Sequence, residues 1–163
     1  ATNANRLIND FLAGAAWEAR ASIETLASAM DVGNPSNMER LRSLGGEATE
    51  LNNKVRAVSV SDAEIEQQLM QNFAEFGFAT CPHTATATFA WRNLDSLERT
   101  EKDWILVGTA HPAKFEQIVE PIIGATVPLP ADLADILARP QKYDEIEPTA
   151  EALESILAQR FSR

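Results

Sequence analysis

Apolar residues recur at helical spacing in the stretch that follows Ser61. The residues on this stripe are Ile65, Leu69, Phe73 and Phe76. The spacing predicts an amphipathic helix, and Gly77 provides its end. Ser61 and Glu64 stand at the spacing of a capping box, in which each side chain accepts a hydrogen bond from the other residue's backbone N–H. We therefore expect Ser61 to cap the start of this helix.

Other helices are predicted from local start signals. A proline suits the first turn of a helix, because its missing N–H would find no partner there. Pro82 and Pro112 are placed to open helices in this way, and Ser36–Glu39 is a second capping-box sequence. The stretches predicted to be helical are the one after Ser36, about 83–94, 112 to near 124, 131–137 and 149–161.

Two stretches are predicted to be extended. The apolar run Trp104–Val107 is typical of a buried strand, and residues 54–60, KVRAVSV, alternate as in a short strand or an extended entry. Residues 95–103 are predicted to form a charged turn. The alternation of helices and strands indicates an α/β fold. Because so few strands are present, either the fold is α+β or the rest of the sheet lies outside this sequence.

Composition narrows the possible partners. The chain has 163 residues, 45% of them hydrophobic and 23% charged, with a formal net charge of −10. This charge argues against nucleic acid as a partner, and no apolar run approaches the length of a membrane span. A single cysteine, Cys81, fits a reducing compartment, so we expect a cytoplasmic protein without a signal peptide. The chain opens without an initiator Met, from which we expect a fragment; the simpler alternative is removal of Met before a small residue such as Ala1.

Candidate chemistry lies in the stretch GTAHPAKF, residues 108–115. It follows the predicted strand, and ligands of open α/β sheets bind beyond the carboxyl ends of strands. Thr109 offers a hydroxyl there, His111 an imidazole and Lys114 an ammonium. The structural alternatives are that Thr109 completes a sheet ladder, His111 caps a turn and Lys114 is solvated.

Three groups of residues resemble the C-terminal part of the threonine synthase family. They are ATNAN at 1–5; AMDV at 29–32 with SNMER at 36–40; and PHTA at 82–85 with TAHPAKF at 109–115. The resemblance covers residues 1–130, and residues 131–163 read as a generic helical tail. Arg6, Asn34-Pro35 and Cys81 depart from the family pattern.

This resemblance implies a partial three-layer domain, a small sheet flanked by helices, cut from a two-domain enzyme of fold type II. The family uses pyridoxal 5'-phosphate to make threonine and phosphate from O-phosphohomoserine and water. The Schiff-base lysine and the Gly-rich phosphate loop are not found here. The lysines of the chain are Lys54, Lys102, Lys114 and Lys142, and Lys102 precedes Asp103 in a charged stretch. The fragment is therefore expected to hold no catalytic residue, to be inactive alone and not to bind the cofactor.

Thr109 is the residue that matches the hydroxyl placed at the pyridine nitrogen in related enzymes. The resemblance makes His111, Lys114, Asn3 and Asn5 candidates for the neighbourhood of the substrate or of a phosphate, although Asn3 and Asn5 could equally form turns. His83, at a helix start, is expected to be a cap or core partner. Two histidines are too few to indicate a metal site.

Two further functions stay open at this point. One is a phospho-lyase that resembles threonine synthase and yields a keto acid from the same phosphorylated amino acid. The other is a non-catalytic stand-alone module with this fold. If the chain is part of the enzyme, its partner is the missing N-terminal part of the same polypeptide. We then expect self-association, or an apolar patch near residues 1–12, where a sheet would be cut.

Overall fold

The structure is a computed structural model that describes residues 1–45 and 48–161. Backbone contacts divide the chain into two compact units, Ala1–Pro128 and Leu129–Arg163. The first unit contains the helices α1 to α7, and the second contains α8 (Ala131–Leu137) and α9 (Ala150–Phe161). The predicted division after residue 130 concerns likeness to a family, so it stays a prediction.

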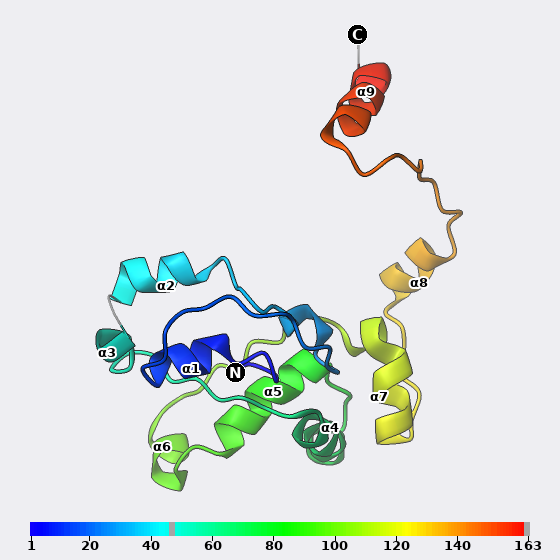
Figure 1. Ribbon diagram of the computed structural model, residues 1–163. Coiled ribbons are helices and arrows are strands. Elements are labelled where there is room, and N and C mark those ends of the chain that lie inside the picture. The colour runs from blue at the N-terminus through cyan, green and yellow to red at the C-terminus, as the bar shows by residue number, and fades with distance from the viewer. Residues whose placement is uncertain (46–47, 162–163) are drawn as a thin grey trace. The chain divides into compact units, whose positions relative to one another are not determined.

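The core of the first unit forms around α4 (Asp62–Phe76) and α5 (Pro82–Arg92), and α4 also packs against α7 (Glu116–Ile123). Its buried apolar side chains are Ala27, Val60, Ile65, Leu69 and Ala85. The predicted start of α4 is confirmed, because Ser61 and Glu64 form both halves of a capping box. Gly77 ends the helix at φ 73°, a left-handed conformation that glycine adopts without steric cost. Figure 1 shows α4 and α5 at the centre of this unit.

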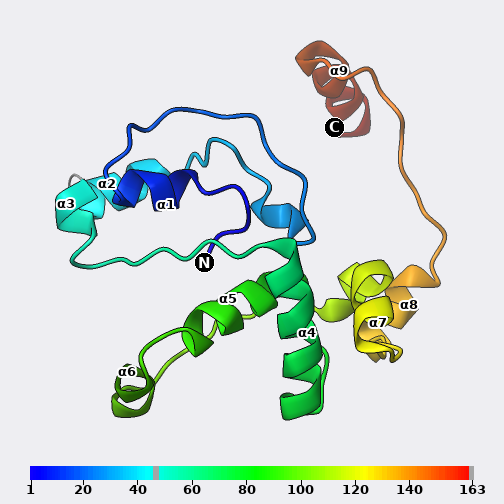
Figure 2. The same ribbon diagram turned by 60° about the horizontal axis from the view of Figure 1, so that its bottom comes forward.

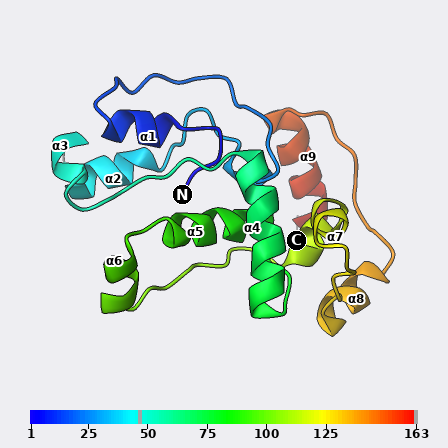
Figure 3. The ribbon, with the colours of Figure 1, turned by 90° about the horizontal axis from the view of Figure 1, so that it is seen from below.

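A second cluster joins three short helices, α1 (Leu7–Leu12), α2 (Met38–Gly45) and α3 (Ala48–Leu51). Figure 2 and Figure 3 show them beside one another. Its buried side chains are Phe11, Leu12, Met38 and Leu51. The apolar patch expected near residues 1–12 is therefore absent from the described surface, because Leu7, Phe11 and Leu12 are buried.

The predicted small sheet and its three-layer arrangement are not confirmed. Among the described residues every regular element is helical, and the β pairing is a single parallel bridge between Thr2 and Ser59. The Thr2 N–H donates to the Val58 carbonyl at 2.8 Å, and the Val60 N–H donates to the Thr2 carbonyl at 2.9 Å. One bridge fixes the register of two extended segments, but a sheet needs further strands.

The prediction that Trp104–Val107 is a buried strand is wrong about the burial. The segment has no helical or turn assignment, but Ile105 is 89% exposed and Val107 is 66% exposed. Backbone groups of residues 104–109 form no backbone hydrogen bonds within the described chain. The physical reason is that no described strand lies beside this segment to cover it.

The charged stretch before this segment is also different from the prediction. Instead of a turn, it holds the helix α6 (Ser96–Glu101). The Asp95 carboxylate accepts a hydrogen bond from the Leu97 N–H at 2.9 Å and so caps the helix. Two short 3-10 helices complete the fold, η1 (Ser28–Met30) and η2 (Pro112–Phe115). No helix in the described ranges is long and apolar enough to cross a membrane.

Candidate functional site

The extended segment before η2 forms a wall of two cavities. Val107 and Thr109 line one cavity, and Gly108 and Ala110 line the other. Successive side chains of an extended chain point to opposite faces, which explains this alternation. The segment therefore lines a cavity on each of its two faces, although it pairs with no strand in the described residues.

The cavity on the Thr109 face has a volume of about 390 Å³. Its lining comes from the chain start, η1, the first half of α5 and the extended segment. The residues are Ala1, Ala29, Met30, His83, Thr86, Ala87, Val107 and Thr109. The Thr109 hydroxyl has no hydrogen-bond partner among the described residues. The cavity thus presents a free hydroxyl at the end of the extended segment.

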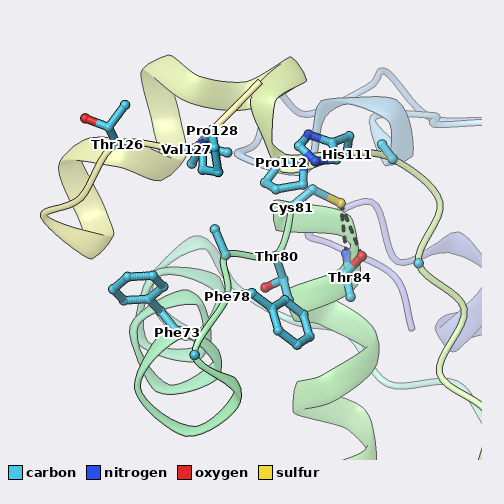
Figure 4. Close-up of a pocket in the computed structure, with 14 residues that line it drawn as sticks. Phe73, Phe78, Thr80, Cys81, Thr84, His111, Pro112, Thr126, Val127 and Pro128 are labelled. Carbon is cyan, nitrogen blue, oxygen red and sulfur yellow. Dashed lines mark hydrogen bonds between the residues drawn. The ribbon is translucent and has the colours of Figure 1, made fainter. Parts of the chain in front are cut away.

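The cavity on the other face has a volume of about 610 Å³ and is more apolar. Figure 4 shows Phe73 and Phe78 on one side, with Pro112, Val127 and Pro128 on another. The Cys81 sulfur accepts a hydrogen bond from the Thr84 N–H at 3.4 Å and caps α5. A methyl group added at Gly108 would meet the Thr84 Oγ1 at 3.7 Å, an ordinary contact, so packing within the chain does not require glycine there.

The structure separates the candidate residues of the GTAHPAKF stretch. Thr109 lines the smaller cavity and His111 lines the larger one, whereas Lys114 is in the lining of neither. The His111 Nδ1 accepts a hydrogen bond from the Ala113 N–H at 3.2 Å, which confirms the alternative that His111 caps a turn. Lys114 is exposed.

Asn3 and Asn5 form a polar network around Asp31. The Asn3 Nδ2 donates to the Asp31 Oδ1 at 2.6 Å, and the Asn5 Nδ2 donates to the same oxygen at 3.2 Å. Thr25 adds its N–H at 2.9 Å and its hydroxyl at 2.7 Å to the Asp31 carboxylate. Asn3 is fully buried, so these contacts satisfy a polar side chain that burial would otherwise destabilise. The network ties the chain start to residues 23–31.

His83 is the residue that the sequence prediction underrated. It is 8% exposed and lines the same cavity as Thr109. The Ala29 N–H donates to its Nε2 at 3.0 Å, and its ring lies 4.8 Å from the Phe115 ring, centroid to centroid. Burial lowers the pKa of His83; Asp31 raises that pKa and Lys114 lowers it further. The expectation that His83 is a core partner holds, but its position beside the cavity had no local signal.

Comparison with known proteins finds a family model similar to part of the chain. A family model described as "Threonine synthase, C-terminal" matches residues 84–157. The matched range extends past residue 130. Over this range the chain is similar to the C-terminal region of threonine synthases.

Individual threonine synthases are similar to this chain in sequence. The chain is 40% identical to the threonine synthase of Serratia marcescens over 134 residues, which are 82% of this chain and 30% of the relative. It is 38% identical to the Escherichia coli threonine synthase over 135 residues, 83% of this chain and 31% of the relative. The resemblance seen in the sequence is confirmed: the chain is related to the C-terminal part of the threonine synthases.

Solved structures of threonine synthases also resemble this chain. The crystal structure of threonine synthase from Escherichia coli matches with a TM-score of 0.79 at 31% identity, over 98% of this chain and 36% of that chain. The structure of "PLP bound Threonine synthase" from Brucella melitensis shares the fold, with a TM-score of 0.76 at 23% identity, over 98% of this chain and 39% of that chain. The chain spans about a third of the length of the relatives it matches.

Proposed function

We propose that this chain is the C-terminal part of a pyridoxal-phosphate-dependent threonine synthase, which converts O-phosphohomoserine and water to threonine and phosphate. The observation that carries the proposal is the free Thr109 hydroxyl in a cavity, within a chain related to threonine synthases. The remaining two thirds of such an enzyme would supply the lysine that holds the cofactor and the loop that binds its phosphate. The chain alone would then be inactive.

The residues of the Thr109 cavity fit a pyridine ring. Its volume of about 390 Å³ lies in the range of small-molecule sites. No carboxylate is among the described lining residues. Pyridoxal phosphate supplies an electron sink for negative charge at the carbon next to its imine nitrogen. The Thr109 hydroxyl would orient the ring by a hydrogen bond to the pyridine nitrogen without holding a proton on it, as a carboxylate would.

His111 and Lys114 are proposed neighbours of a phosphate. His111 uses its Nδ1 to cap η2, which leaves its Nε2 for a ligand. The Lys114 ammonium is exposed and can approach an anion. Asn3 and Asn5 have a positioning role in this proposal, since their side-chain amides bond Asp31 and residues near it.

The partner proposed for this chain is the N-terminal part of the same kind of polypeptide. The segment 104–109 supports this, because its backbone lacks hydrogen bonds in the described chain and its side chains Ile105 and Val107 are exposed. Strands of the N-terminal part would pair with this edge and cover its apolar side chains. The self-association of the isolated chain would use the same edge.

The proposal is tested with Thr109→Val in the full-length enzyme. Valine keeps the shape of threonine but removes the hydroxyl. Loss of a buried hydrogen bond costs about 1 to 3 kcal/mol, so turnover should fall roughly ten- to a hundredfold with the cofactor still bound. Turnover is measured by phosphate release, and cofactor binding by its absorbance spectrum.

The matched control is Thr100→Val, which removes an exposed hydroxyl on α6 away from both cavities. It should leave turnover within about twofold, as surface substitutions usually do. An unchanged turnover and an unchanged cofactor spectrum in Thr109→Val would exclude Thr109 from the site.

A further inference from the structure

His83 connects two of the three groups of residues that resemble threonine synthase. Its Nε2 bonds the Ala29 N–H, 54 residues earlier in the chain. Its ring contacts the Phe115 ring, at the end of the TAHPAKF stretch, and its side chain lines the cavity with Thr109. A single buried side chain therefore contacts Ala29 and Phe115 and also lines the proposed cofactor site.

The Ala29 contact fixes the chemical form of His83. Since the backbone N–H donates to Nε2, this nitrogen carries no proton, and the proton of the neutral ring is assigned to Nδ1. Nδ1 has no hydrogen-bond partner in the described chain, so the ring is held through Nε2 alone. A protonated ring would place an N–H against the Ala29 N–H and lose this bond.

The bond positions one wall of the cavity. Ala29 and Met30 belong to η1, a 3-10 helix of three residues, and both line the cavity. The Thr86 hydroxyl lies 3.8 Å from the Met30 sulfur, a second contact between α5 and this wall. Ala29 is itself exposed, whereas Met30 packs against the core cluster that contains Ala27.

We propose that His83 is a positioning residue of the threonine synthase site, whose unprotonated Nε2 holds the Ala29–Met30 wall against the cavity that Thr109 shares. The catalytic consequence rests on the proposed function, whereas the positioning of the wall does not. Acidification should release the wall, because protonation removes the acceptor.

The charges around His83 set the direction of this response. Burial is the largest influence and lowers its pKa, the Asp31 carboxylate raises it, and the Lys114 ammonium lowers it. The folded protein thus favours the neutral ring. The stability that this preference contributes is complete above the ordinary histidine pKa of about 6.5 and is lost as the pH falls from there to the lowered pKa.

The first test uses the 163-residue chain and needs no cofactor. His83→Phe keeps a ring against Phe115 but removes the acceptor, and His83→Gln offers an amide oxygen near the position of Nε2. Hydrogen exchange at the Ala29 amide should be about tenfold faster in His83→Phe and largely restored in His83→Gln. His111→Phe, the same change at the other histidine, should leave Ala29 exchange unchanged. Equal Ala29 exchange in the wild type and His83→Phe would overturn the positioning role.

A second measurement avoids any dependence on how the variants fold. Side-chain ¹⁵N NMR of the wild-type chain at neutral pH should show the proton of His83 on Nδ1. A proton on Nε2 would overturn the proposal.

In the full-length enzyme, His83→Phe should lower kcat across the pH range and remove the acid-side loss expected of the wild type, and His83→Gln should recover most of kcat. Equal turnover and equal pH profiles in the wild type and His83→Phe would show that the wall is positioned without consequence for catalysis. That result would overturn the catalytic role of His83 and leave the Thr109 test unaffected.

Discussion

The helix pair α4–α5 and the extended segment 104–109 differ in how many of their polar groups and apolar side chains find partners within this chain. In the pair, the buried Asn72 amide donates to the Thr80 hydroxyl at 3.0 Å and to the Thr88 hydroxyl at 2.9 Å. It also accepts from the Gln68 amide at 2.7 Å. The extended segment has no backbone hydrogen bonds in the described chain and exposes Ile105 and Val107. The pair is complete within this chain, and the segment is built for contacts that other residues supply.

A large effect on stability is expected at Asn72. Asn72→Leu removes three buried hydrogen bonds, whereas the Thr88 hydroxyl still donates to the Thr84 and Ala85 carbonyls. We expect the free energy of unfolding of the 163-residue chain to fall by about 3 kcal/mol, measured by urea denaturation. Gln71→Leu, on the exposed face of the same helix, should change it by less than about 0.5 kcal/mol. Similar losses at the two positions would contradict the view of α4–α5 as self-sufficient.

An intermediate effect is expected at the capping box of α4. Ser61→Ala should lower the free energy of unfolding by about 1 kcal/mol, because it leaves the Glu64 N–H without its acceptor. Ser96→Ala, at an exposed serine in the first turn of α6, serves as the control.

The Ser61 variant also has a pH signature. Hydrogen bonds from the Ser61 backbone and side chain lower the pKa of Glu64. Their contribution to stability is present above the ordinary glutamate pKa and is lost as the pH falls through the lowered value. Titration by NMR should show the Glu64 pKa closer to its ordinary value in Ser61→Ala. An unchanged pKa would mean that the Ser61 hydroxyl does not donate to the Glu64 carboxylate in solution.

The smallest expected effect on the isolated chain is at Ile105. Ile105→Ala should change the free energy of unfolding by less than about 0.5 kcal/mol, because the side chain is 89% exposed. The matched change Ile65→Ala, in the core of α4, should cost about 2 to 5 kcal/mol. In the full-length enzyme the same Ile105→Ala should become destabilising, since strands of the N-terminal part would bury it. A large loss in the isolated chain would show that segment 104–109 is already packed there.

Local signals account for what the sequence predicted well. The Ser61 capping box, the stop at Gly77 and the start of α5 at Pro82 each depend on residues within one helical turn. Helix α8 forms over the predicted range 131–137 for the same reason. The charged residues of the stretch 95–103 predict a turn, but the stretch contains a helix because Asp95 caps α6.

Features that depend on distant residues were beyond sequence reasoning. An apolar run such as Trp104–Val107 indicates an extended backbone, but burial requires a neighbouring strand that the described chain does not contain. At the site, side-chain alternation could have predicted that Thr109 faces away from Gly108. It could not have predicted that Ala29 meets His83, a contact that only the folded chain creates.

The alternation along residues 107–110 also restricts how this stretch can change in length. Deletion or insertion of a single residue between Trp104 and Val107 would turn the Thr109 hydroxyl from its own cavity toward the apolar one, and its place would be taken by Ala110 or Gly108, neither of which carries a hydroxyl. Deletion or insertion of two residues would turn the Thr109 hydroxyl back toward its own cavity. Length variation among functional relatives should therefore be confined to the loop before Trp104 or to the residues after α7, while this short stretch keeps a constant number of residues.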